Sequence, residues 1–213
     1  MDKIKLVCFD VDGTLVEGNA WWILTKSLGC SVQDAIDTFE KAGRGEISFR
    51  TAERIFTKRY RESGNANELF IKNIFKNIHV KDEAKKIISY LREKNYKIYL
   101  ISGAIDIYVG FVAKQLNVDG FYANSSLEFD EKGVLQKINY HENQGGLKIK
   151  QLRELTEKLG IGMDQVAFIG DSENDIEVFQ ATRHGIAVSS SVEELKKVAW
   201  KKVDSLIEIK NIL

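Results

Sequence analysis

Two aspartates stand two residues apart in the segment Asp10-Val11-Asp12-Gly13-Thr14, directly after a short apolar run. Two carboxylates so close together repel each other, and a divalent cation offsets that repulsion. A hard ion such as Mg²⁺ prefers carboxylate and carbonyl oxygen ligands. The alternative is a solvated turn, because Asp-Gly is a common turn pair. The segment predicts either a metal-dependent site or a plain turn at a strand end.

Three further segments place polar side chains beside an apolar run or a helix start. Leu100-Ile101-Ser102-Gly103 offers a hydroxyl and a flexible backbone, which suit a phosphate oxygen. Gly145-Gly146-Leu147-Lys148 places a lysine early in a helix, and Ile169–Asp175 carries Asp171 and Asp175 one helical turn apart. Each segment alone has an ordinary structural explanation, as a helix cap or an exposed surface. Their convergence on one edge of a sheet would favour a catalytic site.

The elements that must position these groups alternate along the chain. Short apolar runs at 4–9, 97–101, 165–169 and 185–188 are each followed by a polar or glycine-containing turn and a helical stretch. Such near-continuous apolar runs are typical of parallel strands covered on both faces. The sequence therefore predicts an α/β fold.

Residues 19–78 interrupt this alternation with helical patterns only. Ser31 is a favourable N-cap with Asp34 three residues later, and a second helix begins near Ser48. We expect four helices here, forming a cap above the sheet, and the alternation then resumes with a helix at 82–93. Residues 129–134 predict a β-hairpin turn.

Composition limits the class of protein. The chain has 213 residues, with 31 basic and 31 acidic side chains, so no global charge attracts nucleic acid or an anionic membrane. Two cysteines, Cys8 and Cys30, are expected to be reduced thiols. The N-terminus does not resemble a signal peptide, and no window is long and apolar enough to span a membrane. We expect a soluble, cytoplasmic protein of one sizeable domain, or a core with an insertion.

The order DVDGT, ISG, a lysine and GDSEND resembles the haloacid dehalogenase (HAD) superfamily of phosphohydrolases, and the inserted helices most resemble its phosphoserine phosphatase branch. The resemblance covers essentially the whole chain. It implies a doubly wound, mainly parallel Rossmann-like sheet, with the strand before Asp10 between those leading to Ser102 and Asp171. The implied division is a core of residues 1–17 and 80–213 and a cap of residues 18–79.

The resemblance also implies roles for the acidic residues. Asp10 would be the nucleophile that forms an aspartyl-phosphate, and Asp12 the general acid and then the base. Mg²⁺ would bind the carboxylates of Asp10 and Asp171 and the backbone carbonyl of Asp12. Asp175 would orient the water ligands of the metal.

The transferring phosphoryl group would be held by Ser102, the Gly103 amide and Lys148. Lys150 competes with Lys148, which better matches the spacing of the family before Asp171. Asn174 would contact phosphate or substrate, and Thr14 would support the turn.

The cap departs from the phosphoserine phosphatase pattern. Arg54 resembles the arginine that would bind a substrate carboxylate, with Arg50 as its competitor. Asn19 stands where that branch carries a glutamate for the substrate ammonium, and Glu17 lies two residues earlier. The next residues, Trp21 and Trp22, are expected to serve as core or hinge packing, with substrate walls as the alternative.

The sequence thus predicts a Mg²⁺-dependent phosphomonoester hydrolase for a small phosphorylated metabolite, with phosphoserine as the first candidate. A phosphotransferase that uses an acceptor hydroxyl is the near alternative. A phosphorylatable receiver-type signalling domain is a different class, and the position of the aspartate on the first strand and the large cap argue against it.

Overall fold

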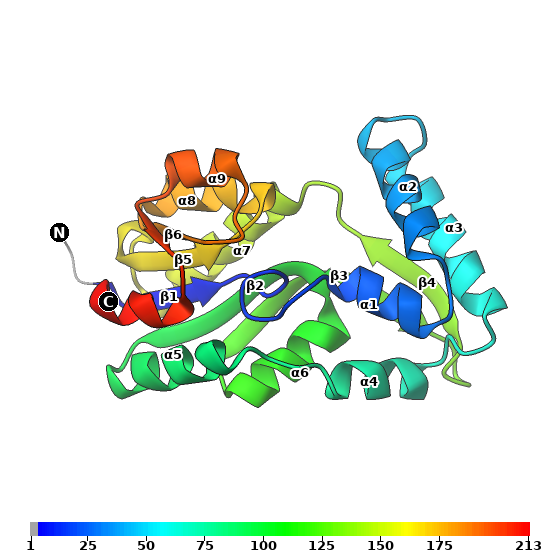
Figure 1. Ribbon diagram of the computed structural model, residues 1–213, viewed down its shortest axis with the longest axis horizontal. Helices are drawn as coiled ribbons and strands as arrows, with labels where there is room; N and C mark the ends of the chain where they lie inside the picture. Colours follow the sequence, from blue (N-terminus) through cyan, green and yellow to red (C-terminus); the bar gives the residue numbers. More distant parts are fainter. Residues whose placement is uncertain (1–3) are drawn as a thin grey trace.

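A seven-stranded sheet forms the centre of the computed structural model, which describes residues 4–213 (Figure 1). Its order is β4-β3-β2-β1-β5-β6-β7, and only the pairing of β3 with β4 is antiparallel. The strands are β1 (Leu6–Phe9), β2 (Lys97–Ile105), β3 (Gly120–Phe129), β4 (Leu135–Tyr140), β5 (Val166–Gly170), β6 (Gly185–Val188) and β7 (Lys201–Val203). The predicted α/β fold with a doubly wound, mainly parallel sheet is confirmed.

Helices cover both faces of this sheet, which explains why its central strands are apolar throughout. All four residues of β1 are buried, with Leu6 and Cys8 in one core cluster and Val7 and Phe9 in the other. One face carries α5 (Asp82–Glu93) and α6 (Asp106–Leu116), and the other α7 (Gln144–Leu159), α8 (Ile176–Thr182) and α9 (Glu193–Val198) (Figure 1).

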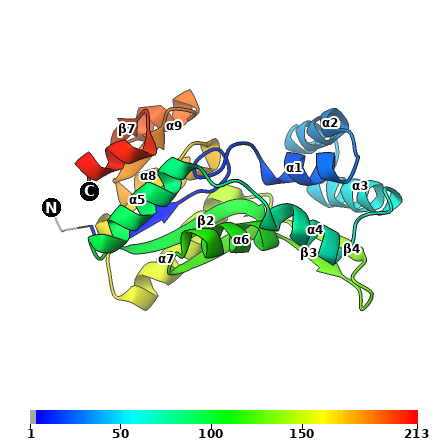
Figure 2. The same cartoon turned by 60° about the horizontal axis from the view of Figure 1, so that its bottom comes forward.

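The inserted segment is helical, as predicted, and extends from one end of the molecule (Figure 2). Each of its helices begins with a side-chain cap that accepts a backbone N–H, including the predicted bond from the Asp34 amide to Ser31. The helices are α1 (Ala20–Ser27), α2 (Val32–Gly43), α3 (Phe49–Glu62) and α4 (Glu68–Lys76).

The sequence patterns missed three strands and shortened a fourth. β3 and β4 mix polar and apolar residues and lie toward one edge of the sheet, while β7 has three residues, of which Lys201 and Lys202 are exposed. β2 continues to Ile105, so the expectation that a strand ends before Ser102 is wrong. Its pairing with β3 shifts register between Ser102 and Ile105, which lets polar residues occur inside the strand.

The β3–β4 hairpin has the predicted turn and is tied to the inserted helices. Backbone bonds join the Glu68 amide to the Gly133 carbonyl at 2.8 Å and the Leu135 amide to the Ala66 carbonyl at 2.9 Å. The Tyr140 amide donates to the Glu53 carboxylate of α3 at 2.7 Å. The helical cap therefore packs on an extension of the central sheet.

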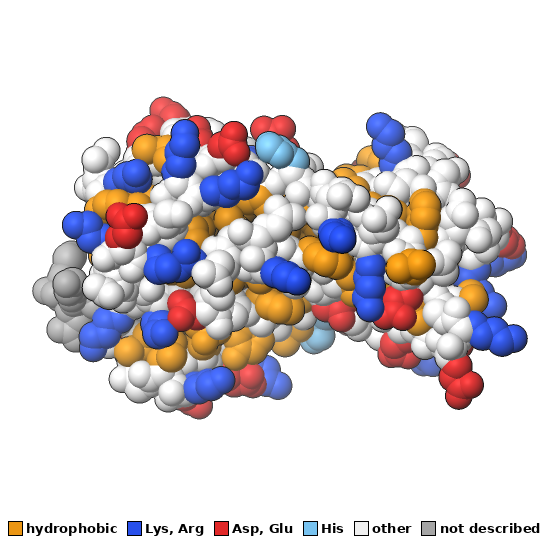
Figure 3. Space-filling model, turned by 90° about the horizontal axis from the view of Figure 1, so that it is seen from below, with side chains coloured by type: hydrophobic (Ala, Val, Ile, Leu, Met, Phe, Trp, Pro, Cys, Tyr) orange, Lys and Arg blue, Asp and Glu red, His pale blue; other side chains and the backbone are white. Residues whose placement is uncertain are grey.

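Charged side chains of both signs are interspersed over the face seen in Figure 3, consistent with the balanced composition. Among residues 4–213, no helix combines the length and the apolar character that crossing a bilayer requires.

Candidate active site

The register of the central strands brings the motif segments to one edge of the sheet. Phe9 pairs with Leu100 of β2 and with Ile169 of β5, so Asp10 comes level with the segments that carry Ser102 and Asp171. The Asp10 amide donates to the Ile169 carbonyl at 2.9 Å, which ties the first residue of the motif to β5. The predicted order, with β1 between β2 and β5, is confirmed.

The turn after β1 is held in place from two sides. Gly13 has a φ of 71°, and a Cβ at this position would overlap the Asp171 carboxylate. Lys81 donates from Nζ to the carbonyl oxygens of Gly13 and Thr14, each at 3.1 Å. Lys81, the residue before α5, belongs to no sequence motif and was not predicted as part of the site.

Lys148 is the buried cation of the site. Its side chain is 0% exposed, and Nζ lies 2.7 Å from Asp175 Oδ1, 2.6 Å from Asn174 Oδ1 and 3.3 Å from Asp10 Oδ1. Burial lowers the pKa of Lys148, but Asp10 and Asp175 outweigh burial, so the net pKa is raised and the amine stays protonated. Lys150 is 72% exposed and pairs only loosely with Glu154. Of the two lysines, Lys148 faces the carboxylates.

Asp171 and Asp175 differ in how their oxygens are used. Thr14 donates to Asp171 Oδ1 at 3.2 Å. Asp175 is fully buried: Oδ1 accepts from Lys148, and Oδ2 accepts from the amides of Asp171 and Ser172 at 3.1 and 3.2 Å. Asp175 therefore positions both the lysine and the Asp171 loop.

The carboxylates of Asp10, Asp171 and Asp175 can each place one oxygen within 4.8 Å of the others. Asp10 Oδ1 is buried, and although Lys148 is 3.3 Å away, none of the described residues 4–213 donates to it with hydrogen-bond geometry. A donor set made only of oxygens, with one buried oxygen unsatisfied, fits a hard divalent cation. The residues present are therefore compatible with Mg²⁺.

Three carboxyl groups at this site, those of Asp12, Asp171 and Asp175, have raised pKa values. Burial and the nearby Asp10 charge raise the pKa of Asp12 to about 7, against the hydrogen bond from the Ala20 amide. Burial and the charges of Asp10 and Asp175 raise the pKa of Asp171 to about 7. A carboxyl that titrates near neutrality is suited to proton transfer in both directions.

These shifts predict a pH-dependent stability for the metal-free protein. Between about pH 4 and 7 the folded chain binds more protons than the unfolded chain, so the free energy of unfolding falls as the pH rises. We expect the Tm of chelator-treated protein to fall by at least about 5 °C from pH 5 to pH 8, since 1 kcal/mol corresponds to about 2–4 °C at this size. Differential scanning calorimetry with and without Mg²⁺ measures the effect.

Millimolar Mg²⁺ should raise the Tm more at pH 8 than at pH 5, because protons compete with the cation for the carboxylates. Asp171→Asn should remove most of this Mg²⁺ effect, whereas Asp204→Asn, at an exposed residue outside the cluster, should preserve it. An equal rise at both pH values would contradict the prediction.

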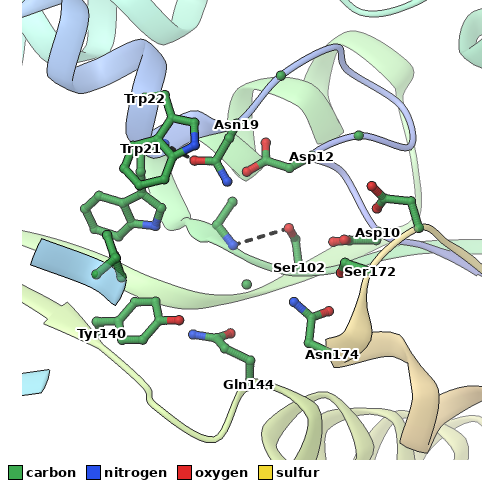
Figure 4. A pocket seen from close by; sticks show the side chains of 16 residues that line it. Asp10, Asp12, Asn19, Trp21, Trp22, Ser102, Tyr140, Gln144, Ser172 and Asn174 are labelled. Atoms are coloured by element: carbon green, nitrogen blue, oxygen red, sulfur yellow. Dashed lines mark hydrogen bonds between the residues drawn. The ribbon is translucent and has the colours of Figure 1, made fainter. Parts of the chain in front are cut away.

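The candidate phosphate ligands lie at the same edge. Ser102 is buried, and its Oγ accepts from the Ala104 amide at 3.3 Å. Ser125 of β3 donates to the Gly103 carbonyl at 2.9 Å, which fixes the local backbone. The Asn174 amide nitrogen faces Gly103. Figure 4 shows Asp10, Ser102 and Asn174 grouped on one side of the pocket.

A cavity of about 450 Å³ opens above these residues. Its walls include Trp21 and Trp22 of α1, Phe39 of α2 and Tyr140 of β4 (Figure 4). The two tryptophans also pack against Phe39, with ring centroids at 6.2 and 5.7 Å. They thus serve both as packing and as walls of the cavity.

Three residues proposed for substrate recognition lie elsewhere. Arg54 and its competitor Arg50 line a separate groove between α3 and β4. Glu17 is exposed and does not line the cavity, whereas Asn19 does and also caps α1. The structure therefore brings Asn19, but neither Arg54 nor Glu17, to the motif residues.

Several residues of the site carried no signal in the sequence. Tyr108 of α6 is buried, and its hydroxyl lies against Asp12, whose pKa this contact lowers. Tyr140 and Gln144 come from β4 and the start of α7, and β4 was not predicted as a strand. These residues could be found only from the spatial arrangement.

The family can be assigned from the chain as a whole. Residues 4–182 match the haloacid dehalogenase-like hydrolases. The chain belongs to the haloacid dehalogenase-like hydrolase family. It is therefore a hydrolase of this family.

Among the relatives, the phosphoserine phosphatase of Archaeoglobus fulgidus is 28% identical over 98% of this chain, which spans about 60% of the length of that protein. The phosphoserine phosphatase of Streptococcus thermophilus is 28% identical over 88% of this chain and 85% of its own length. A substrate-bound phosphoserine phosphatase structure superimposes with a TM-score of 0.77 over all of both chains, at 22% identity. The predicted resemblance to HAD phosphatases is confirmed.

Proposed function

We propose that this enzyme hydrolyses small phosphomonoesters through an aspartyl-phosphate on Asp10. The observation that carries the proposal is the cluster of Lys148, Asp10 and Asp171 at the carboxyl edge of the sheet, under a cavity large enough for a metabolite. Ligands of open α/β sheets bind at this edge. A buried cation beside a carboxylate nucleophile reduces the repulsion between that nucleophile and an anionic phosphate.

In the first step a carboxylate oxygen of Asp10 attacks phosphorus, and the bond from phosphorus to the ester oxygen breaks. Asp12 donates its proton to the leaving oxygen, so the alcohol departs neutral. In the second step Asp12 takes a proton from water, and the water oxygen displaces Asp10 from phosphorus. The products are an alcohol and inorganic phosphate, and both aspartates return to their first state.

Ser102, the Gly103 amide and Lys148 would hold the phosphoryl oxygens, with Asn174 beside them. Asp10, Asp171 and the Asp12 carbonyl would hold Mg²⁺, with Asp175 and Thr14 positioning Asp171. When bound, this cation would neutralise negative charge on the phosphoryl group. Lys148 contributes a fixed positive charge 3.3 Å from Asp10.

Phosphoserine is the first substrate to test, because it is named in the relatives described above. Membership of a hydrolase family argues against the receiver-type alternative. Phosphoryl transfer to an alcohol would share the first step, and it is distinguished by the product.

Phosphate release from a panel of phosphorylated metabolites tests the proposal. We expect turnover with Mg²⁺ and a loss of at least about a thousandfold after chelation, since nucleophile and substrate are both anionic. Re-addition of Mg²⁺ should restore turnover. Undiminished activity in excess chelator would contradict the metal requirement.

Release of the leaving group without phosphate, in the presence of an added alcohol, would identify a transferase.

A further inference from the structure

The cavity above Asp10 has two chemically different ends. The motif residues and the amide of Asn174 form the polar end. The opposite end is walled by four aromatic side chains: Trp21, Trp22, Phe39 and Tyr140. Tyr140 packs edge-on against Phe39 at 5.4 Å and stacks on Phe49 at 5.4 Å and 19°. Since the phosphoryl group must lie at Asp10, the alcohol part of a substrate lies against the aromatic walls.

Among residues 4–213, no charged side chain lines the aromatic end of the cavity. Of the described residues that line the cavity, only Asp10, Asp12 and Asp171 carry a charge, and all three belong to the phosphate end. The wall amide of Gln144 is already engaged, since Oε1 accepts from Asn124 at 2.8 Å and Nε2 donates to the His141 carbonyl at 2.6 Å. Gln144 therefore has little free hydrogen-bonding capacity. The other uncharged polar groups toward the aromatic walls are Asn19, whose Oδ1 accepts from the Trp21 amide at 2.9 Å, and the hydroxyl of Tyr140.

The basic residues of the cap face another surface. On α3 the buried positions are Ala52, Phe56 and Tyr60, and Phe56 packs on Phe39 at 5.1 Å, behind the cavity wall. Arg54 is exposed and lines the outer groove between α3 and β4. The face of α3 that is directed to the cavity is thus aromatic. Arg54 lies on the outer groove, and Arg59 donates to the Asp34 carbonyl of α2 at 3.2 Å.

The charges of an amino-acid leaving group fit this cavity poorly. A carboxylate or an ammonium group loses hydration when it enters, and it finds no opposite charge to compensate the loss. An uncharged ring instead gains contact with the indole and phenol faces, which favour offset or edge-on packing. Pockets for small molecules are typically lined by hydrophobic and aromatic side chains with a small number of polar groups.

We infer that the substrate is a phosphomonoester whose leaving group is an uncharged alcohol that bears a ring with an apolar face. This rests on the proposed function and specifies its substrate class. Two kinds of alcohol share this chemistry, an aromatic alcohol and a sugar, and the cavity of about 450 Å³ accommodates either.

A comparison of four phosphate compounds tests the inference. Benzyl phosphate and glucose 6-phosphate represent the two kinds of ring, and phosphoserine represents the charged leaving group. Acetyl phosphate, whose leaving group is small, measures phosphoryl transfer to Asp10 with few contacts to the aromatic walls. We expect kcat/KM to be at least about 100-fold higher for one of the ring compounds than for phosphoserine. Preference for benzyl phosphate or for glucose 6-phosphate identifies the kind of ring.

A value for phosphoserine equal to or above both ring compounds would overturn the inference while leaving the phosphatase function in place. No turnover of any of the four, acetyl phosphate included, would overturn the proposed function itself. The two failures are therefore distinguishable.

Variants of the wall provide an independent test. Trp22→Ala should lower kcat/KM for the preferred ring compound at least about tenfold more than for acetyl phosphate. Trp22→Phe, which keeps an aromatic face, should retain most of the preference. Leu69→Ala, at an 80% exposed apolar residue of α4, is the matched control and should not change the ratio. If Arg54→Ala selectively raised KM for phosphoserine, a carboxylate contact would exist and the inference would be wrong.

Discussion

Asp10→Asn lowers turnover at least about a thousandfold, while the protein stays folded. The amide cannot displace an alkoxide from phosphorus, so the first step is lost. The fold is preserved because Asp175 still pairs with Lys148 at 2.7 Å and because the Asp10 amide, which ties β1 to β5, is unchanged. Removing one negative charge from the carboxylate cluster also lowers repulsion in the metal-free protein.

Steady-state phosphate release and thermal unfolding measure the two parts of this prediction. Mass spectrometry of acid-quenched wild-type protein should find a phosphoryl group on the peptide that contains Asp10, and the variant should lack it. Asp204→Asn controls for loss of a carboxylate outside the site. Activity of Asp10→Asn near the wild-type level would refute the nucleophile assignment.

Lys148→Met produces the second large effect, on stability and on activity together. The lysine is fully buried and satisfies Asp175 Oδ1, Asn174 Oδ1 and the charge of Asp10. Removing one partner of a buried ion pair leaves an uncompensated charge and costs about 3–5 kcal/mol. We therefore expect a Tm at least about 6 °C lower, since 1 kcal/mol corresponds to about 2–4 °C.

The same variant should lose activity by at least about a hundredfold, because the phosphoryl oxygens and Asp10 lose their protein cation. Lys150→Met is the matched control, at a 72% exposed lysine two residues further along α7, and both properties should stay near wild type. Lower activity in Lys150→Met than in Lys148→Met would reverse the assignment of the two lysines. Activity and calorimetry on both variants decide between them.

The parts of the fold that were predicted are strands buried on both faces of the sheet and helices marked by their periodicity or by a capping residue. β1 and β6 are completely buried, and their apolar runs marked them as central strands. α5 was predicted with its observed limits, and Ser31 and Ser48 located the starts of α2 and α3. Local patterns were sufficient wherever a residue type reports directly on burial or capping.

The strands that were missed are governed by tertiary contacts. β4 has the sequence Leu-Gln-Lys-Ile-Asn-Tyr. Its ends are held by Glu53 of α3 and by Ala66 of the loop before α4, through bonds that no local pattern encodes. The same limit applies to the site. The residues at the phosphate end of the cavity could be predicted from motifs. The aromatic walls of the cavity depend on which side of α3 faces inward and on where β4 ends. Arg54 was expected at the substrate because of its place in the sequence. Its position around the axis of α3 instead directs it to the outer groove.

The attachment of the hairpin limits how the enzyme can admit a substrate. β3 pairs with β2 beside the phosphate end, and the β3–β4 hairpin continues under α3 and α4 and supplies Tyr140 to the cavity. A helical lid on two flexible hinges could swing away without disturbing the sheet. Here the helices are bonded to an extension of that sheet, so any opening must also bend two paired strands. We therefore expect substrate exchange to proceed by small displacements of side chains and loops at the mouth of the cavity, with the helices remaining docked throughout the catalytic cycle.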